Sequence, residues 1–183
     1  MATQVQEQTS YSIDPAHTSV EFVVRHLMIT KVRGRFGTVS GIVELEPGSD
    51  SPRFVQATID AASIDTREAQ RDTHLKSPDF FDVEKFPTLE FVSTRIEDAP
   101  DADFTIYGNL TIHGVTREVA LTASFEGRAA DPWGGQRAGF TASTTINRKD
   151  FGMTWNAAIE TGGVVVGDEV RIELEVEAIA KTA

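Results

Sequence analysis

Apolar and polar side chains alternate along most of this chain with a period of two residues. The clearest example is residues 170–178, where Val, Ile, Leu, Val and Ala alternate with one Arg and three Glu residues. Seven further segments repeat the pattern, at residues 20–24, 39–45, 55–61, 89–91, 104–112, 119–125 and 138–142. Such alternation is typical of strands with one apolar and one solvated face. It predicts about eight antiparallel strands.

The breaks between these segments carry turn and helix signals. Residues 112–115 (IHGV) predict a two-residue hairpin, because Gly114 tolerates a positive φ. One stretch departs from the period of two, and residues 66–76 predict a single short helix. Asp65 would cap this helix with Glu68 three residues on, and Pro78 would end it.

Together these elements predict an all-β fold, an extended antiparallel β-barrel of about eight strands with one short α-helix outside it. Closure into a barrel removes the exposed strand edges, and a two-sheet sandwich is the competing arrangement. Residues 1–9 are polar and are expected to form a flexible N-terminal tail. Residues 10–183 would then form one domain, as the length of 183 residues suggests.

Amino-acid composition excludes several classes of partner and of functional site. Lys and Arg number 17 against 28 Asp and Glu, a formal charge of −11, which argues against nucleic acid and anionic membrane surfaces as partners. There is no cysteine, which excludes disulfides, thiolate metal sites and cysteine nucleophiles. The first ten residues lack the basic and apolar regions of a secretory signal, and no long apolar run predicts membrane insertion. We therefore expect a cytoplasmic protein.

Signals for catalysis are weak. The four histidines, at positions 17, 26, 74 and 113, have no metal-binding spacing, and the sequence contains no HExxH, GxSxG, GxGxxG or phosphate-binding loop. Asp14 and His17 could pair, as such residues commonly do in turns. We expect no catalysis, no metal and no cofactor. An enzyme that uses His17 or His26 with a carboxylate on an amphiphilic substrate is the alternative.

The inner faces of the predicted strands suggest where a ligand would bind. Strand parity places Phe22, Val24, Phe91, Ile106, Phe140 and Ala142 on the inner wall. A register error of one residue would reverse part of this assignment. The small residues of these faces, such as Gly41, Gly108 and Ala142, either leave room for a ligand or fit the taper of a filled barrel.

Two polar features and one aromatic cluster could serve the same interior. His26 shares the parity of Phe22 and Val24, so it either orients a headgroup or is a hydrogen-bonded core histidine. Residues 31–35 (KVRGR), which include Arg35, hold three cations that either gate an anionic headgroup or form a solvated hairpin. The aromatic residues 80–91, with Met153 and Trp155, form either a lid or a satellite core.

Several linked motifs resemble the YceI-like family. They are residues 14–22 (DPAHTSVEF), 75–87 (LKSPDFFDVEKFP), 108–116 (GNLTIHGVT), 146–152 (INRKDFG) and 170–174 (VRIEL). Their order and spacing cover about residues 11–180. The resemblance implies a lipocalin-like barrel, often dimeric, whose long apolar lumen takes a polyisoprenoid or a similar amphiphile.

The resulting expectation is a non-catalytic homodimer that holds an isoprenoid-type lipid, a polyprenyl compound or an isoprenoid quinone, for transport, storage or sequestration. His26 and Arg35 are the candidates for orienting the headgroup. Many relatives are exported, whereas the N-terminus here has no export signal. A stress-associated interaction module with a filled barrel remains a further alternative.

Overall fold

A computed structural model describes residues 10–100, 102–160 and 162–181. The flexible tail predicted for residues 1–9 lies outside these ranges. The described residues form eleven strands, three short 3-10 helices and one α-helix. The strands are β1 (Ser10–Ile13), β2 (Ser19–His26), β3 (Thr30–Phe36), β4 (Val39–Leu45), β5 (Pro52–Asp60), β6 (Ile64–Asp65), β7 (Thr88–Ala99), β8 (Ala102–Ile112), β9 (Val115–Ala130), β10 (Gln136–Asn147) and β11 (Val166–Ala180). The helices are η1 (Pro15–His17), η2 (Ala61–Ser63), α1 (Ala69–Lys76) and η3 (Arg148–Phe151).

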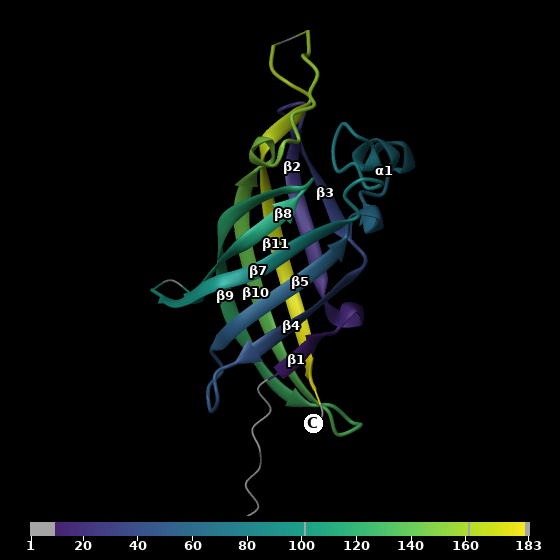
Figure 1. Ribbon diagram of the computed structural model, residues 1–183. Helices are drawn as coiled ribbons and strands as arrows, with labels where there is room; N and C mark the ends of the chain where they lie inside the picture. The colour runs from purple at the N-terminus through teal and green to yellow at the C-terminus, as the bar shows by residue number, and fades with distance from the viewer. Residues whose placement is uncertain (1–9, 101, 161, 182–183) are drawn as a thin grey trace, which may run out of the picture.

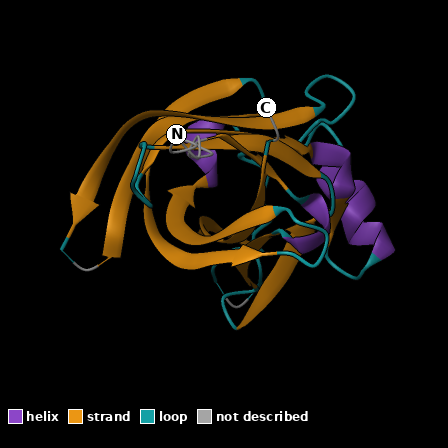
Figure 2. Ribbon diagram, turned by 90° about the horizontal axis from the view of Figure 1, so that it is seen from below, coloured by secondary structure: helices purple, strands orange, loops and turns teal. Residues whose placement is uncertain are grey.

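Eight of the strands close into an antiparallel barrel, which confirms the predicted fold class and excludes the sandwich (Figures 1 and 2). The ring runs β1-β4-β5-β7-β8-β9-β10-β11 and returns to β1. The remaining strands β2, β3 and β6 extend the same sheet beyond β11. The helix α1 lies outside the barrel, as predicted.

The long strand β11 pairs with two different strands along the same edge. Its last residues pair with β1, with Ala178 opposite Ile13 and Ala180 opposite Tyr11. Its earlier residues pair with β2, with Ile172 opposite Phe22. The sheet therefore forks at β11: one branch closes the barrel, and the other carries β2 and β3 upward beside it (Figure 1).

The helix begins later than predicted. Arg67 has a φ of 64°, and helix α1 starts at Ala69, with Glu68 as its N-cap. The Glu68 carboxylate accepts hydrogen bonds from the backbone N–H groups of Gln70 and Arg71 at 3.1 and 2.6 Å. Asp65, the predicted cap, instead lies in β6, so the predicted start was wrong by three residues. The end was correct, since α1 stops before Pro78.

The hairpin between β8 and β9 is confirmed. His113 and Gly114 have φ values of 53° and 71°, the left-handed conformation of a two-residue turn. A β-carbon at Gly114 would lie 2.4 Å from the ring of Phe86. Glycine is therefore required here by both its backbone conformation and the ring packed against it.

Two inner-face glycines accommodate larger neighbours and do not enlarge the interior. A β-carbon at Gly108 would lie 2.4 Å from the Phe91 ring and 2.7 Å from the carbonyl oxygen of Val92. At Gly41 it would lie 2.8 Å from a methyl group of Ile13. For these two positions the taper interpretation is right, because the missing side chain makes space for a neighbour on the same wall.

Substituting Gly108 tests this packing. Because backbone and ring atoms both lie within 3 Å of the new methyl group, Gly108→Ala should lower the free energy of unfolding by about 1–3 kcal/mol. Gly139→Ala in β10 is the matched control, since its nearest heavy atom would be 3.5 Å away, and it should cost nothing. Urea unfolding measures both. Equal stability of the two variants would contradict the packing described for Gly108.

Candidate functional site

The interior of the barrel contains a cavity of about 220 Å³. Its walls are largely aliphatic and aromatic side chains from the barrel strands and β2. The polar residues among those that line it are Thr18, Glu21, Thr141, Thr144 and Arg148. The barrel is therefore not completely filled by its own side chains, contrary to the filled-barrel alternative.

All six residues predicted as wall from strand parity line this cavity: Phe22, Val24, Phe91, Ile106, Phe140 and Ala142. They come together because residues opposite each other on neighbouring strands share a face. Ile106, for example, lies opposite Leu121, and both line the cavity. Their position on the wall is a structural observation, and their contact with a ligand remains a prediction.

Part of the wall comes from outside the strands. Leu75 of α1, Phe80, Phe81 and Met153 also line the cavity, and we call these four residues the aromatic cover. The ring of Phe81 packs edge-on against Phe36 at 5.7 Å between centroids. The predicted cluster is thus part of the cavity wall, with two exceptions. Trp155 packs against His74 and Phe80 behind the wall. Phe86 packs against His113 in the β8–β9 hairpin.

A polar contact fastens the aromatic cover. The Nε2 atom of His74 lies 2.8 Å from a carboxylate oxygen of Asp79. The imidazole also stands edge-on to Phe80 and Trp155, with centroids 5.1 and 4.7 Å away. These contacts join α1 to the segment that follows η3.

Arg148 is a buried cation on the cavity wall, only 3% exposed. Its guanidinium donates hydrogen bonds to four carbonyl oxygens, those of Gly167, Met153, Trp155 and Val166. Its Nη2 atom is also 3.6 Å from the Asp168 carboxylate. Burial lowers the pKa of Arg148 from its ordinary value.

An arginine has five N–H donors, and four of them are used by these carbonyl oxygens. Arg148 therefore orders the segment after η3 and directs most of its donors to the backbone. Its parity with Ala142 and Ile146 is the sequence signal that would have placed it on the wall.

The two residues expected to orient a headgroup are not among the described residues that line the cavity. Arg35 is exposed, and its guanidinium lies 3.2 Å from the Asp65 carboxylate. It faces outward because Gly34 and Phe36, on either side of it, face the interior. His26 is the last residue of β2, two positions beyond Val24, opposite Thr30. Neither residue is placed on the cavity wall, and the role of each in orienting a headgroup stays a prediction.

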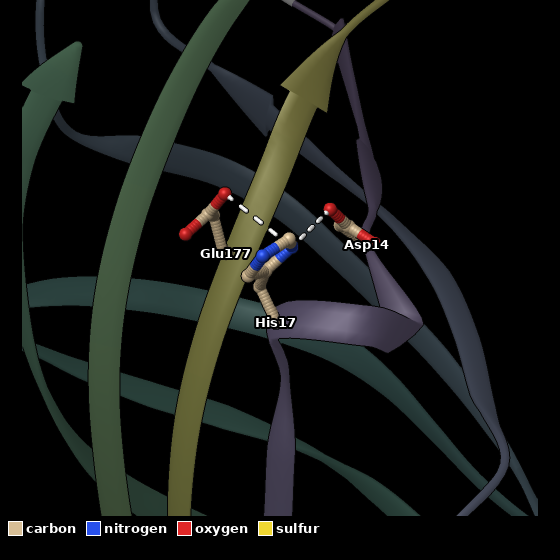
Figure 3. Close-up of side chains that lie close together, drawn as sticks. All are labelled: Asp14, His17 and Glu177. Carbon is tan, nitrogen blue, oxygen red and sulfur yellow. Dashed lines mark hydrogen bonds and ion pairs between the residues drawn. The ribbon is translucent and has the colours of Figure 1, made fainter. Parts of the chain in front are cut away.

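A second cluster of ionisable groups lies near the fork in the sheet (Figure 3). The Nδ1 atom of His17 is 2.8 Å from an Asp14 carboxylate oxygen and 4.0 Å from Glu177. The geometry brings three potential metal ligands within 4.8 Å of one another. However, the Nη1 atom of Arg137 lies 2.8 Å from Asp14 and 2.5 Å from Glu177. The arginine already pairs with both carboxylates, so a metal ion would have to displace it.

The position of this cluster explains its role. Asp14 follows β1, and its backbone N–H donates to the carbonyl oxygen of Glu177 in β11 at 2.8 Å. The Thr18 hydroxyl, just before β2, donates to the same carbonyl at 3.3 Å. The cluster therefore fastens the point where β11 exchanges β1 for β2 as its partner. None of Asp14, His17 and Glu177 is among the described residues that line the cavity.

Hydrogen bonds from His17 and Arg137 lower the pKa of Asp14 from 3.8 to about 2. A carboxyl group whose pKa is lowered by folding stabilises the folded state above its unfolded pKa, and this contribution is lost as the pH falls through the folded pKa. The contribution of Asp14 should be about 1 kcal/mol after allowance for solvent screening. It should be complete above about pH 4 and disappear towards pH 2.

Asp14→Asn should therefore destabilise the protein at neutral pH and flatten the acid limb of its stability curve. The measurement is the urea midpoint as a function of pH. Asp98→Asn, at an exposed carboxylate of β7, is the control and should leave the curve unchanged. If Asp14→Asn and the wild type lose stability in parallel on acidification, Asp14 does not make this contribution.

None of the helices in the described part of the chain is long and apolar enough to span a membrane.

Comparison with known proteins identifies relatives of this barrel. A UPF0312 protein of Shewanella baltica is 37% identical over 183 residues, which cover 99% of this chain and 93% of that protein. A crystal structure of the Campylobacter jejuni YceI protein is 31% identical, with a TM-score of 0.74, and the match covers 86% of this chain and 90% of that one.

A structure of a polyisoprenoid binding domain from Saccharophagus degradans, implicated in plant cell wall breakdown, has a TM-score of 0.68 and covers 94% of this chain and 99% of that one. At 16% identity, this likeness shows a shared fold. The YceI-like domain itself matches residues 11–178. The chain therefore belongs to the YceI-like family.

Proposed function

We propose that this protein is a non-catalytic binding protein that holds a long isoprenoid-type lipid, a polyprenyl compound or an isoprenoid quinone, in the barrel lumen. The role would be transport, storage or sequestration of that lipid. The observation that carries the proposal is the apolar cavity bounded by the strands and the aromatic cover. The shared fold with the polyisoprenoid binding domain of Saccharophagus degradans supports the same ligand class.

The wall favours recognition of a chain over recognition of a headgroup. Burial of each methylene group contributes about 0.8 kcal/mol, so an isoprenoid tail gains affinity along its whole length. Arg148, the one cation among the described lining residues, directs four hydrogen bonds to backbone carbonyl oxygens. We therefore expect the lumen to discriminate by length and shape of the tail and to tolerate different headgroups.

The positions of the candidate catalytic groups support a binding role. The enzyme alternative requires His17 or His26 beside the substrate, and neither is among the described residues on the cavity wall. The partner of His17, Asp14, is also held by Arg137. We propose that a bound lipid leaves chemically unchanged and that the lipid is the only bound organic group. Recovery of an altered lipid after incubation would favour the enzyme.

The homodimer and the cytoplasmic location stay predictions. Light scattering on the purified protein tests the first, and fractionation of the source cells tests the second.

Organic extraction of the purified protein followed by mass spectrometry tests the ligand class. The expected result is a long-chain isoprenoid recovered in proportion to protein. The reason is that such a chain is insoluble in water and leaves the lumen slowly. Repeated absence of lipid, together with no binding of added polyprenyl compounds, would reject the proposal.

A lumen-blocking substitution locates the lipid. Ala142→Trp places an indole on the inner wall of β10 and should abolish lipid recovery. Ala120→Trp is the matched control, because Ala120 is exposed on β9, and it should retain the lipid. Both variants should show strand-dominated circular dichroism. Equal lipid recovery from the two folded variants would place the lipid outside the lumen.

A further inference from the structure

The turn between β2 and β3 exposes large apolar side chains. Met28 and Ile29 are 59% and 79% exposed, and Val164 in the segment before β11 is also exposed. We call these three residues the apolar tip. They account for three of the five large apolar side chains exposed in the described parts of the chain, the others being Val92 and Trp133. The apolar tip is thus a local concentration of exposed apolar surface.

The backbone of this turn is unusual for the residues that occupy it. Leu27 and Met28 have φ values of 51° and 59°, a conformation that turns normally assign to Gly, Asn or Asp. Local preference therefore opposes apolar residues here, and so does their exposure to water. Departures of this kind from local rules are expected where function requires particular side chains.

The two segments of the tip are joined in the fold. The backbone N–H of Leu27 donates to the carbonyl oxygen of Val165 at 2.8 Å. Met28 packs over Gly163, where a β-carbon would lie 2.6 Å from the methionine sulfur. The turn and the segment before β11 therefore lie side by side, at the top of Figure 1.

Three cations lie directly below the tip. Arg25 and Lys31 are opposite each other on β2 and β3, and Arg33 follows two residues later on β3. Like charges directly opposite on paired strands are unfavourable. Over residues 10–100, 102–160 and 162–181, none of the three forms an ion pair within 4.0 Å, whereas nearby Arg35 and Arg171 do.

Arg25, Lys31 and Arg33 line a surface groove between β2, β3 and β11. The carboxylates that line this groove do not neutralise the three cations. They are Asp168, Glu169 and Glu173. Asp168 lies 3.0 Å from Lys149, and Glu173 lies 2.9 Å from Arg171, so Glu169 alone remains to oppose the three cations. Residues 25–33 contain no carboxylate.

We propose that this end of the barrel docks on an anionic lipid bilayer. The apolar tip would enter the headgroup layer, and Arg25, Lys31 and Arg33 would contact lipid phosphates. At about 3.3 Å per residue, the first pair of cations lies within about 7 Å of the turn, which is the depth of the interfacial layer that amphipathic segments occupy.

The net charge of −11 does not prevent this contact. At physiological salt, charges further away than about 8 Å are largely screened, so an approaching bilayer senses the tip and its three cations. The expectation that anionic membranes are not partners used only the total charge of the chain. The present proposal rests on how that charge is distributed.

This docking goes beyond the proposed lipid binding and does not require a loaded lumen. It would bring one end of the cavity wall close to the membrane. Val24 and Val166 line the cavity, and Val166 lies opposite His26, the residue just before the turn.

Flotation with vesicles tests the docking. The wild-type protein should float with vesicles of phosphatidylcholine mixed with phosphatidylglycerol and should be released by high salt. It should bind vesicles of phosphatidylcholine alone much more weakly. The double variant Lys31→Gln/Arg33→Gln should lose about thirtyfold in affinity, since each cation near an anionic surface contributes about fivefold. Arg117→Gln, at an exposed cation of β9, should change binding little.

A matched pair of surface variants tests the contribution of the apolar tip to vesicle binding. Met28→Ser/Ile29→Ser should reduce binding at least about tenfold, because it removes the side chains that enter the bilayer. Trp133→Ser removes a side chain that is 85% exposed, in the β9–β10 hairpin at the opposite end of the barrel (Figure 1), and should leave binding intact. Unchanged thermal unfolding of each variant shows that the fold is retained.

The proposal is overturned if the wild type fails to float with anionic vesicles at low salt. It is also overturned if Trp133→Ser abolishes flotation while Met28→Ser/Ile29→Ser does not. Flotation is measured with added vesicles and not with extracted lipid, so a failure here leaves the lumen proposal standing, and the reverse also holds.

Discussion

The fold depends on one strand having two partners on the same edge. The barrel closes through a short pairing between β1 and the end of β11, while the rest of β11 pairs with β2. Asp14, Glu177 and Arg137 hold this fork through the backbone hydrogen bond from Asp14 to Glu177 and a cluster of ion pairs. Without it, β1 would stay paired with β4 alone. The barrel would then open between β1 and β11 and leave two strand edges exposed, which sheets do not do without a cost.

Closure in turn creates the lumen and determines what it can recognise. Each strand directs alternate residues inward, so an uninterrupted apolar wall results wherever the alternation is regular. The aromatic cover completes the wall beside β3, where Phe81 packs against Phe36. Arg148 donates hydrogen bonds to carbonyl oxygens of the segment after η3 and of β11, and so holds the two together. The outcome is an interior suited to a chain and poor in groups for a headgroup.

The parts of this structure that sequence reasoning predicted are those set by local rules. Strand parity placed Phe22, Ile106 and Phe140 on the wall because side-chain direction depends only on neighbouring residues. The turn at His113 and Gly114 was equally local.

The fork at β11 was not predicted, because the choice of partners along one strand depends on residues more than a hundred positions away. Arg35 was chosen as a headgroup ligand from its charge, whereas its parity in β3 directs it outward to Asp65. The helix start was missed because Arg67 has a φ of 64° and Glu68, not Asp65, caps α1.

The most direct test of the central claim is the affinity of the protein for a series of polyprenyl compounds of increasing chain length and constant headgroup, measured by calorimetry. If the lumen holds the chain, affinity should rise with each added isoprene unit, because each buried methylene group contributes about 0.8 kcal/mol. It should then level off when the chain exceeds the cavity. An affinity independent of chain length, or one that follows the headgroup instead, would contradict the account.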